Sequence, residues 1–219
     1  MFYQSIRIQI AIITKLINNT KFKIDKGDHL LDTHTHILWN IDDGSKNQCM
    51  SLQMLEIAAR SGTKAIFATP HVIERANKPS WEEIKEKTQQ LRQLCAEAQI
   101  DIMLYPGAEV QMNWELLPEL GAAGAYCLNG GRYLLVELPA AEIPAYADEF
   151  WYELELKGIT PILAHPERYQ QLRENPDLLL LWRRRGMLMQ CNSGSFTGMF
   201  GSSVCENAKV LLANGLVDL

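Results

Sequence analysis

The sequence predicts an α/β fold, a single barrel of parallel strands surrounded by helices. From residue 29 onward, short β-rich runs alternate with helical patterns, as expected for βα units built around a parallel sheet. The 219 residues, of which 47% are hydrophobic, suit one domain with a sizeable core. Seven β-rich runs without an internal linker favour a closed or nearly closed barrel. An open doubly wound sheet is the alternative, but no segment resembles a glycine-rich dinucleotide-binding loop.

The predicted strands and helices alternate along the chain with no internal linker. The strands are expected at residues 29–33, 64–69, 101–105, 133–138, 159–164, 187–191 and 216–219. The helices are expected near residues 46–61, 80–98, 143–157, 168–185 and 202–213, with a shorter one near 113–120. Leu52 and Leu55 recur at helical spacing in the first helix, and Gly62 follows it as a stop. Ser80 begins the second helix as an N-cap, and Glu82 lies in its first turn.

The net charge limits the kinds of partner that the protein can bind, and the cysteines indicate its cellular compartment. A formal net charge of −5 argues against nucleic acid as the main partner, because binding phosphate backbones needs a basic face. The five cysteines are odd in number and include no Cys-x-x-Cys pair. With no secretory signal in the sequence, we expect reduced thiols in a cytoplasmic protein.

Residues 1–28 form a basic segment ahead of the predicted barrel. Their apolar stretch, residues 8–17, is too short to span a bilayer and lacks the cleavage site of a secretory signal. A helix lying on a membrane surface is the alternative. We expect a poorly ordered N-terminal extension at 1–28 and a barrel domain at 29–219.

Histidines and carboxylates follow the predicted strands at the points where these end. They are His34 and His36 after the first strand, His71 after the second, Glu109 after the third, Glu137 near the end of the fourth and His165 at the end of the fifth. The carboxyl ends of the strands in a parallel α/β barrel surround one mouth, where such folds place their chemistry. Four of the five histidines in the chain lie at these points, so we expect a multinuclear metal site there.

Several of these residues also have a purely structural explanation. His71 follows a proline and could cap a turn, and His165 precedes a proline and could begin a helix. Glu109, after a Pro-Gly pair, could be a solvated turn residue. Glu137 is harder to explain in this way, because a carboxylate among apolar neighbours is costly to desolvate unless it is paired or bound to metal.

The ligand types narrow the choice of metal and of reaction. Imidazole and carboxylate donors without thiolates suit Mn²⁺, Fe²⁺ or Zn²⁺ better than Ca²⁺ or Mg²⁺. Glu137 could bridge two ions, and two adjacent ions can activate water for attack. Arg168 offers a planar donor fork for phosphate oxygens, so the expected reaction is hydrolysis of a phosphate ester. No cysteine has an arginine six residues later, which argues against a Cys-x₅-Arg phosphatase loop.

Five motifs stand out along the chain. They are Asp32-Thr33-His34-Thr35-His36, Ile41-Asp42-Asp43-Gly44-Ser45, Ala68-Thr69-Pro70-His71, Gly107-Ala108-Glu109 and Ala164-His165-Pro166-Glu167-Arg168-Tyr169. Together they resemble the PHP (polymerase and histidinol phosphatase) superfamily. The Asp-Asp-Gly segment combined with the His-x-Glu-Arg-Tyr segment is most similar to the bacterial protein-tyrosine phosphatases encoded with capsular and exopolysaccharide genes. The likeness runs from about residue 31 to the C-terminus.

This resemblance implies a distorted (β/α)₇ barrel that holds up to three metal ions, commonly manganese. It implies metal ligation by His34, His36, His71, Glu109, Glu137 and His165, and phosphate binding by Arg168. The implied activity is removal of phosphate from tyrosines of the tyrosine autokinase that controls polysaccharide export. A small phosphate monoester such as histidinol phosphate is the alternative substrate.

The end of the chain departs from the family pattern. In the family the last strand ends in an Asp-x-His pair that completes the metal cluster, and another arginine and a final helical region follow. Here the sequence reaches Leu219 as that strand begins, and Asp218 lies too early to replace the pair. We therefore expect an incomplete last strand, no closing helix, weak metal occupancy, low activity and reduced stability. An inactive barrel that only binds the kinase is a further alternative.

Overall fold

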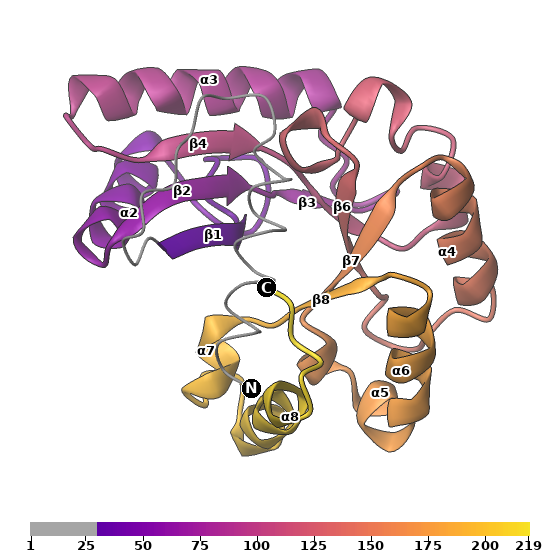
Figure 1. Ribbon diagram of the computed structural model, residues 1–219. Helices are drawn as coiled ribbons and strands as arrows, with labels where there is room; N and C mark the ends of the chain where they lie inside the picture. Colours follow the sequence, from indigo (N-terminus) through magenta and orange to yellow (C-terminus); the bar gives the residue numbers. More distant parts are fainter. Residues whose placement is uncertain (1–29) are drawn as a thin grey trace.

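The computed structural model describes residues 30–219. The predicted N-terminal extension, residues 1–28, and the first residue of the predicted domain, residue 29, lie outside the described residues. In the described part, strands converge on a common centre and helices lie on the outside (Figure 1).

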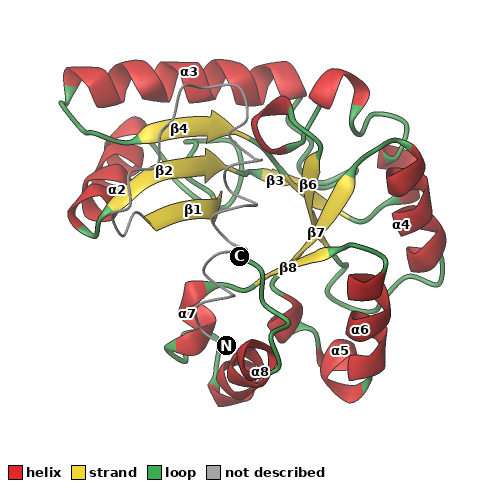
Figure 2. Ribbon diagram, in the orientation of Figure 1, coloured by secondary structure: helices red, strands yellow, loops and turns green. Residues whose placement is uncertain are grey.

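All hydrogen-bonded pairs between the strands of residues 30–219 are parallel, as Figure 2 illustrates. The strands are β1 (Leu30–Thr35), β2 (Thr63–Ala68), β3 (His71–Val72), β4 (Met103–Pro106), β5 (Glu109–Gln111), β6 (Tyr133–Glu137), β7 (Thr160–Ala164) and β8 (Leu188–Gln190). They are ordered β1-β2-β4 in one sheet and β3-β5-β6-β7-β8 in the other. The predicted α/β fold with parallel strands is therefore confirmed.

The two sheets are parts of one curved wall. β2 leads into β3 across Pro70, and β4 leads into β5 across Gly107. At this bend the Gly107 N–H donates to the Ala68 carbonyl at 2.9 Å, and the Glu109 N–H donates to the Pro70 carbonyl at 3.0 Å. The neighbouring strands thus stay paired through the bend, and the wall follows the order of the chain. Within the described residues no pairing joins β1 to β8.

The helices cover the outside of this wall. They are α2 (Gln48–Arg60), α3 (Trp81–Glu97), α4 (Ala147–Leu156), α5 (Gln170–Glu174), α6 (Pro176–Arg184), α7 (Ser193–Phe196) and α8 (Ser202–Ala213). The side chains of Asn47 and Ser80 cap α2 and α3, each accepting a main-chain N–H of the first turn. The helix predicted near 113–120 is wrong in extent, since only a 3₁₀ turn, Trp114–Leu116, forms there.

The single helix predicted at 168–185 is also wrong. The segment consists of the 3₁₀ turn η4 (Pro166–Arg168), then α5, then α6. Asn175 separates the two helices with φ −132° and ψ 73°, and Pro176 begins α6. A residue before proline is pushed out of the helical region, so the proline ends one helix and starts the next.

Residues 216–219 lie beside β8, although they do not form the predicted strand. The Leu219 N–H donates to the Met189 carbonyl at 3.2 Å, and the Cys191 N–H donates to the Leu219 carbonyl at 3.1 Å. These bonds are one step of a parallel ladder. The buried Asp218 carboxylate accepts a hydrogen bond from Arg183 at 2.7 Å, so its charge is paired away from the histidines.

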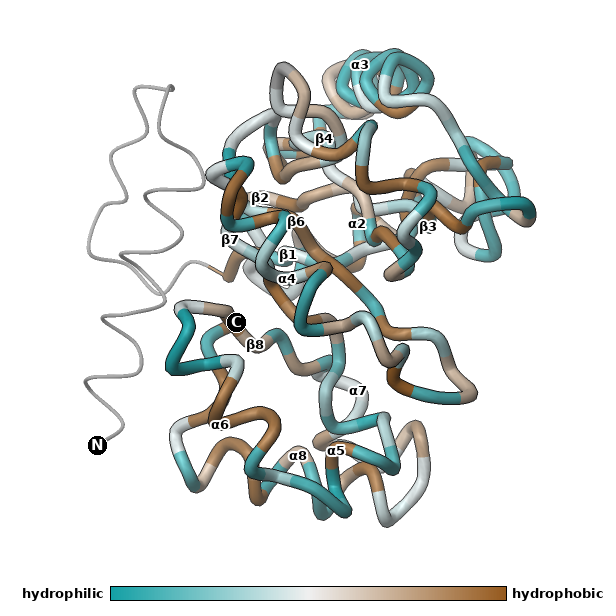
Figure 3. Tube along the Cα trace, turned by 90° about the vertical axis from the view of Figure 1, so that its right-hand side faces the viewer, coloured by the Kyte–Doolittle hydropathy of each residue, from teal (hydrophilic) through white to brown (hydrophobic). Residues whose placement is uncertain are grey.

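Apolar side chains are buried on both faces of the wall, which explains why the strand sequences are almost continuously apolar. A smaller cluster fills the concave side with residues from alternate positions of β2, β4, β6 and β7, together with Leu128 from the turn before β6. Its buried members are Ala65, Phe67, Tyr105, Leu128, Tyr133, Leu135, Ile162 and Ala164. The larger cluster packs the strands against the helices. In Figure 3, β6 is mostly brown, whereas α3 is mostly teal.

Candidate metal centre

Glu109, the first residue of β5, is the centre of the candidate site. Its side chain is buried, and its Oε2 lies 3.0 Å from Nε2 of His34 and 3.2 Å from Nε2 of His36. The two Nε2 atoms are 3.3 Å apart. The two imidazoles at the end of β1 therefore converge on one carboxylate, as the His-x-His spacing predicts.

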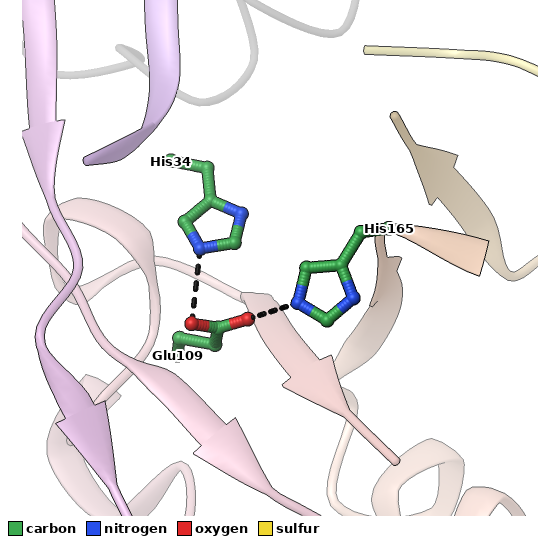
Figure 4. A group of neighbouring side chains, drawn as sticks. All are labelled: His34, Glu109 and His165. Atoms are coloured by element: carbon green, nitrogen blue, oxygen red, sulfur yellow. Dashed lines mark hydrogen bonds and ion pairs between the residues drawn. The ribbon is translucent and has the colours of Figure 1, made fainter. Parts of the chain in front are cut away.

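His165 approaches the other oxygen of the same carboxylate. Its Nε2 lies 2.7 Å from Oε1 of Glu109, and Figure 4 shows the rings of His34 and His165 on two sides of the carboxylate. His165 follows β7 with φ 36° and ψ 54°, a left-handed conformation that is uncommon for a residue with a side chain. Such strain is often found at functional sites. The buried Nδ1 atom of His165 has no hydrogen-bond partner among residues 30–219.

His71 and Glu137 extend the cluster on the side of β3 and β6. Nδ1 of His71 lies 3.1 Å from Oε2 of Glu109 and 3.3 Å from Oε1 of Glu137. Oε2 of Glu137 lies 4.0 Å from Nε2 of His165. Glu137 ends β6, and its apolar neighbours are fully buried. The desolvation expected for this carboxylate is thus relieved by imidazole neighbours.

The structure brings together all six residues predicted as ligands. In three groups, each residue offers a nitrogen or oxygen ligand atom, and these atoms lie within 4.8 Å of one another. The groups are His34, Glu109 and His165; His71, Glu109 and Glu137; and His36, Asp43 and His71. Two groups share Glu109 and two share His71, so the arrangement suits adjacent ions. Imidazole and carboxylate donors of this kind fit a divalent transition metal.

The histidines and carboxylates of the cluster shift one another's pKa. Burial opposes protonation of His36, but the hydrogen bonds and charges of Asp42 and Glu109 outweigh it and raise its pKa to about 10. Burial would raise the pKa of Glu109, but its hydrogen bonds to His165, His34 and His36 bring that pKa well below the ordinary value. Glu109 is therefore an ionised carboxylate deep in the protein, which a bound cation would stabilise.

Asp42 contacts two residues of the candidate site, although the sequence analysis did not assign it a role. Its Oδ2 lies 2.6 Å from Nδ1 of His36 and accepts the main-chain N–H of His71 at 3.0 Å. Its Oδ1 accepts the N–H of Gly44 at 2.9 Å. A side chain at Gly44 would place Cβ 2.2 Å from the His36 carbonyl oxygen, so only glycine fits this turn. The Asp-Asp-Gly motif was the available signal.

Two further residues join the cluster from its edges. The exposed Asp43 carboxylate lies 3.8 Å from Nε2 of His71 and completes the third candidate group. From β8, Oε1 of Gln190 lies 3.0 Å from Nδ1 of His34. This contact orients the His34 ring so that Nε2 faces Glu109.

Arg168 lies on η4, directly after the His165 turn, and is exposed. Its Cζ is 4.8 Å from the centre of the Phe200 ring. The preceding residue, Glu167, is fully buried, and its Oε1 accepts the Ser195 hydroxyl at 2.6 Å and the Asn192 N–H at 3.0 Å. These bonds hold η4 against the segment that follows β8.

Residues 30–219 match the family model described as capsular polysaccharide synthesis, CpsB/CapC. The tyrosine-protein phosphatase YwqE of Bacillus subtilis is 35% identical over 175 residues, which are 80% of this chain and 69% of YwqE. The tyrosine-protein phosphatase CpsB of Streptococcus pneumoniae is 29% identical over 164 residues, which are 75% of this chain and 68% of CpsB.

Solved structures agree with these sequence matches. One similar chain comes from the crystal structures of YwqE from Bacillus subtilis and CpsB from Streptococcus pneumoniae, described as metal-dependent tyrosine phosphatases. It has a TM-score of 0.80 and 34% identity, and the match covers 86% of this chain and 76% of that one. A candidate histidinol phosphatase from Listeria monocytogenes has a TM-score of 0.50 at 11% identity, covering 86% and 92%, and shows the same fold only.

Two further properties concern the whole described part. No helix in residues 30–219 combines the length and apolar character needed to cross a bilayer.

All five cysteines lie in this part of the chain, and none forms a disulfide there. Burial raises the pKa of the Cys127 thiol to about 12 and also raises those of Cys95 and Cys191. Protonated, buried thiols are poor nucleophiles.

Proposed function

Because the chain belongs to the CpsB/CapC family of capsular polysaccharide synthesis, we propose that it is a metal-dependent protein-tyrosine phosphatase. Its substrate in this proposal is a phosphorylated tyrosine autokinase of capsule or exopolysaccharide synthesis, and its compartment is the cytoplasm. The names of YwqE and CpsB, two similar proteins, support the reaction. Residues 29–219 would form the catalytic domain, with residues 1–28 as an extension outside it.

The observation that carries the proposal is the convergence of imidazole nitrogens on the buried Glu109 carboxylate at 2.7–3.2 Å. The residues that would hold the metal ions are His34, His36, His71, Glu109, Glu137 and His165, with Asp43 as an additional candidate. We propose Mn²⁺ as the ion, with Fe²⁺ and Zn²⁺ as alternatives. When bound, such ions polarise a phosphoryl group and make water a better nucleophile.

The chain's own residues would orient the reactants and balance charge. Asp42 and Gln190 hold the rings of His36 and His34, so that both Nε2 atoms face the same carboxylate. Arg168 would bind oxygens of the transferred phosphoryl group, for which its planar fork is suited. Cys127 and Cys191 are disfavoured as nucleophiles, since burial raises the pKa of both thiols and keeps these side chains protonated.

The test is hydrolysis of a phosphotyrosine peptide by the full chain with Mn²⁺, before and after chelation. We expect turnover with Mn²⁺, loss of turnover with chelator, and recovery when Mn²⁺ is restored. His34→Ala should abolish turnover without changing the fold. Activity that survives both chelation and His34→Ala would refute the proposal. A chain that binds no transition metal and shows no turnover would instead support the inactive barrel.

A further inference from the structure

Two large apolar side chains are exposed beside Arg168. Met199 is 75% and Phe200 is 40% exposed, and both lie in the loop between α7 and α8. This loop follows the carboxyl end of β8, and Arg168 lies in the connection that follows β7. In a parallel α/β wall such connections surround the mouth that carries the chemistry. The contact between Arg168 and the Phe200 ring joins the two connections at this mouth.

The loop folds back over α7. The Met199 N–H donates to the Gly194 carbonyl at 3.1 Å, and the Gly198 N–H donates to the Ser195 carbonyl at 3.3 Å. A Cβ at Gly194 would lie 3.1 Å from Sδ of Met199 and 3.3 Å from the Phe200 ring, so both side chains pack closely over this glycine. One part of each side chain therefore rests on α7, and the remainder is exposed.

Glu167 fixes the loop relative to Arg168. Its buried carboxylate accepts hydrogen bonds from Ser195 and Asn192, and its carbonyl accepts one from the Asn207 amide at 3.0 Å. Removing a partner from such a buried carboxylate is costly, so this connection is rigid. Arg168, which follows Glu167 directly, and Phe200 are thus parts of one unit.

We propose that Met199 and Phe200 select aryl phosphates over alkyl phosphates at the proposed phosphatase site, on which this inference rests. Phe200 acts as a positioning residue, because the attraction between its ring and the guanidinium holds Arg168 at the mouth. The two apolar side chains also contact the phenyl ring of the substrate, through aromatic and sulfur–aromatic interactions. An alkyl phosphate would keep the contacts of its phosphoryl group with Arg168 and the metal ions but lacks the contact with these side chains.

The chain offers a matched control for this loop. Trp114 is 45% exposed and also lies just after a strand of the wall, β5. Its ring is already packed edge-on against Tyr146, with ring centres 5.8 Å apart. An effect of general surface hydrophobicity would appear equally in variants of Trp114 and of Phe200.

The experiment is calorimetric titration of the full, Mn²⁺-loaded chain with phenylphosphonate and with methylphosphonate, which are not hydrolysed. The unmodified chain should bind phenylphosphonate more tightly. Phe200→Ala should weaken phenylphosphonate binding about threefold to tenfold more than methylphosphonate binding. Methylphosphonate itself should lose about twofold to fivefold through the freed Arg168. Phe200→Tyr should restore both affinities, and Trp114→Ala should change neither.

Hydrolysis separates this inference from the proposed function. With a phosphotyrosine peptide, Phe200→Ala should raise KM and leave kcat nearly unchanged. An unmodified chain that binds both phosphonates equally, or a Trp114→Ala variant that loses the preference for the phenyl group, would overturn the inference while phosphatase activity stands. A chain that keeps the phenyl preference but hydrolyses no phosphotyrosine would overturn the proposed function alone. Failure to bind either phosphonate would overturn both.

Discussion

Asp42 supports two histidines of the candidate metal site at the same time. One of its oxygens, Oδ2, contacts Nδ1 of His36 at 2.6 Å and the main-chain N–H of His71 at 3.0 Å. Burial would raise the pKa of Asp42, but the hydrogen bond and the charge of His36 lower it below the ordinary value. An ionised Asp42 fixes the His36 proton on Nδ1 and leaves Nε2 directed at Glu109.

We therefore expect Asp42→Asn to weaken Mn²⁺ binding about 10- to 100-fold, the usual effect of losing such a supporting carboxylate. The variant keeps the shape of the side chain and removes only its charge. Calorimetric titration of the metal-free chain with Mn²⁺ measures the change. Asp101→Asn is the control, because Asp101 forms an exposed ion pair with Lys64 far from the cluster. Equal affinity in both variants would contradict this role.

At the scale of residues, the sequence predicted the candidate metal ligands better than the residues that contact and orient them. Each ligand candidate could be found because an apolar run placed it at a strand end. The contact between Gln190 and His34 joins residues 156 positions apart, and no local pattern reports it. Asp43 was part of a recognised motif, but its proximity to His71 depends on a turn closed by Gly44.

Thr69 joins two elements at the bend of the wall. Its hydroxyl oxygen accepts the Thr35 N–H at 2.9 Å, and its own N–H donates to the Thr35 carbonyl at 2.9 Å. Thr69 is fully buried, so water cannot replace its hydroxyl. Thr35 separates His34 from His36, and the bond therefore holds the end of β1 where both imidazoles leave it.

Thr69→Val should lower the free energy of unfolding by about 1–3 kcal/mol, since it leaves the Thr35 N–H without its acceptor at nearly unchanged volume. Urea titration of the metal-free chain measures this. Thr88→Val is the matched control, because this buried threonine bonds only the Ile84 carbonyl within α3 at 2.7 Å. Such a bond adds little to a helix, so a loss as large as that of Thr69→Val would disprove the explanation.

The sequence predicted whether a segment is a strand or a helix more reliably than where one element is interrupted and the next begins. The apolar runs gave β1, β2, β4, β6, β7 and β8, yet the short strands β3 and β5, which resume the wall beyond the bend, were missed. The cause is that β3 contains two residues and β5 three, too few for a periodic pattern. The division of residues 168–185 was missed as well, although Pro176 was the visible signal.

At the scale of the whole molecule, the candidate ligands tie together strands that are distant in sequence. His34 lies on β1, at one end of the wall, and His165 follows β7, next to the strand at the other end. Both reach the same carboxylate of β5. In the described residues no strand pairing closes the gap between β1 and β8. A cation bound between these side chains would therefore add to the contact between His34 and Gln190 of β8 in linking the two ends of the wall.

We expect Mn²⁺ to stabilise the entire fold for this reason, because it binds ligands that come together only in the native state. At a free concentration 100 times its dissociation constant, the gain in unfolding free energy should be about 2.7 kcal/mol. Urea titrations with Mn²⁺ and with chelator measure it. His165→Ala should abolish most of the gain, whereas Arg75→Ala, which removes only an exposed ion pair with Glu115, should retain it. An unfolding midpoint that does not respond to Mn²⁺ would mean that the convergent side chains hold no ion, and the proposed phosphatase mechanism would fail with them.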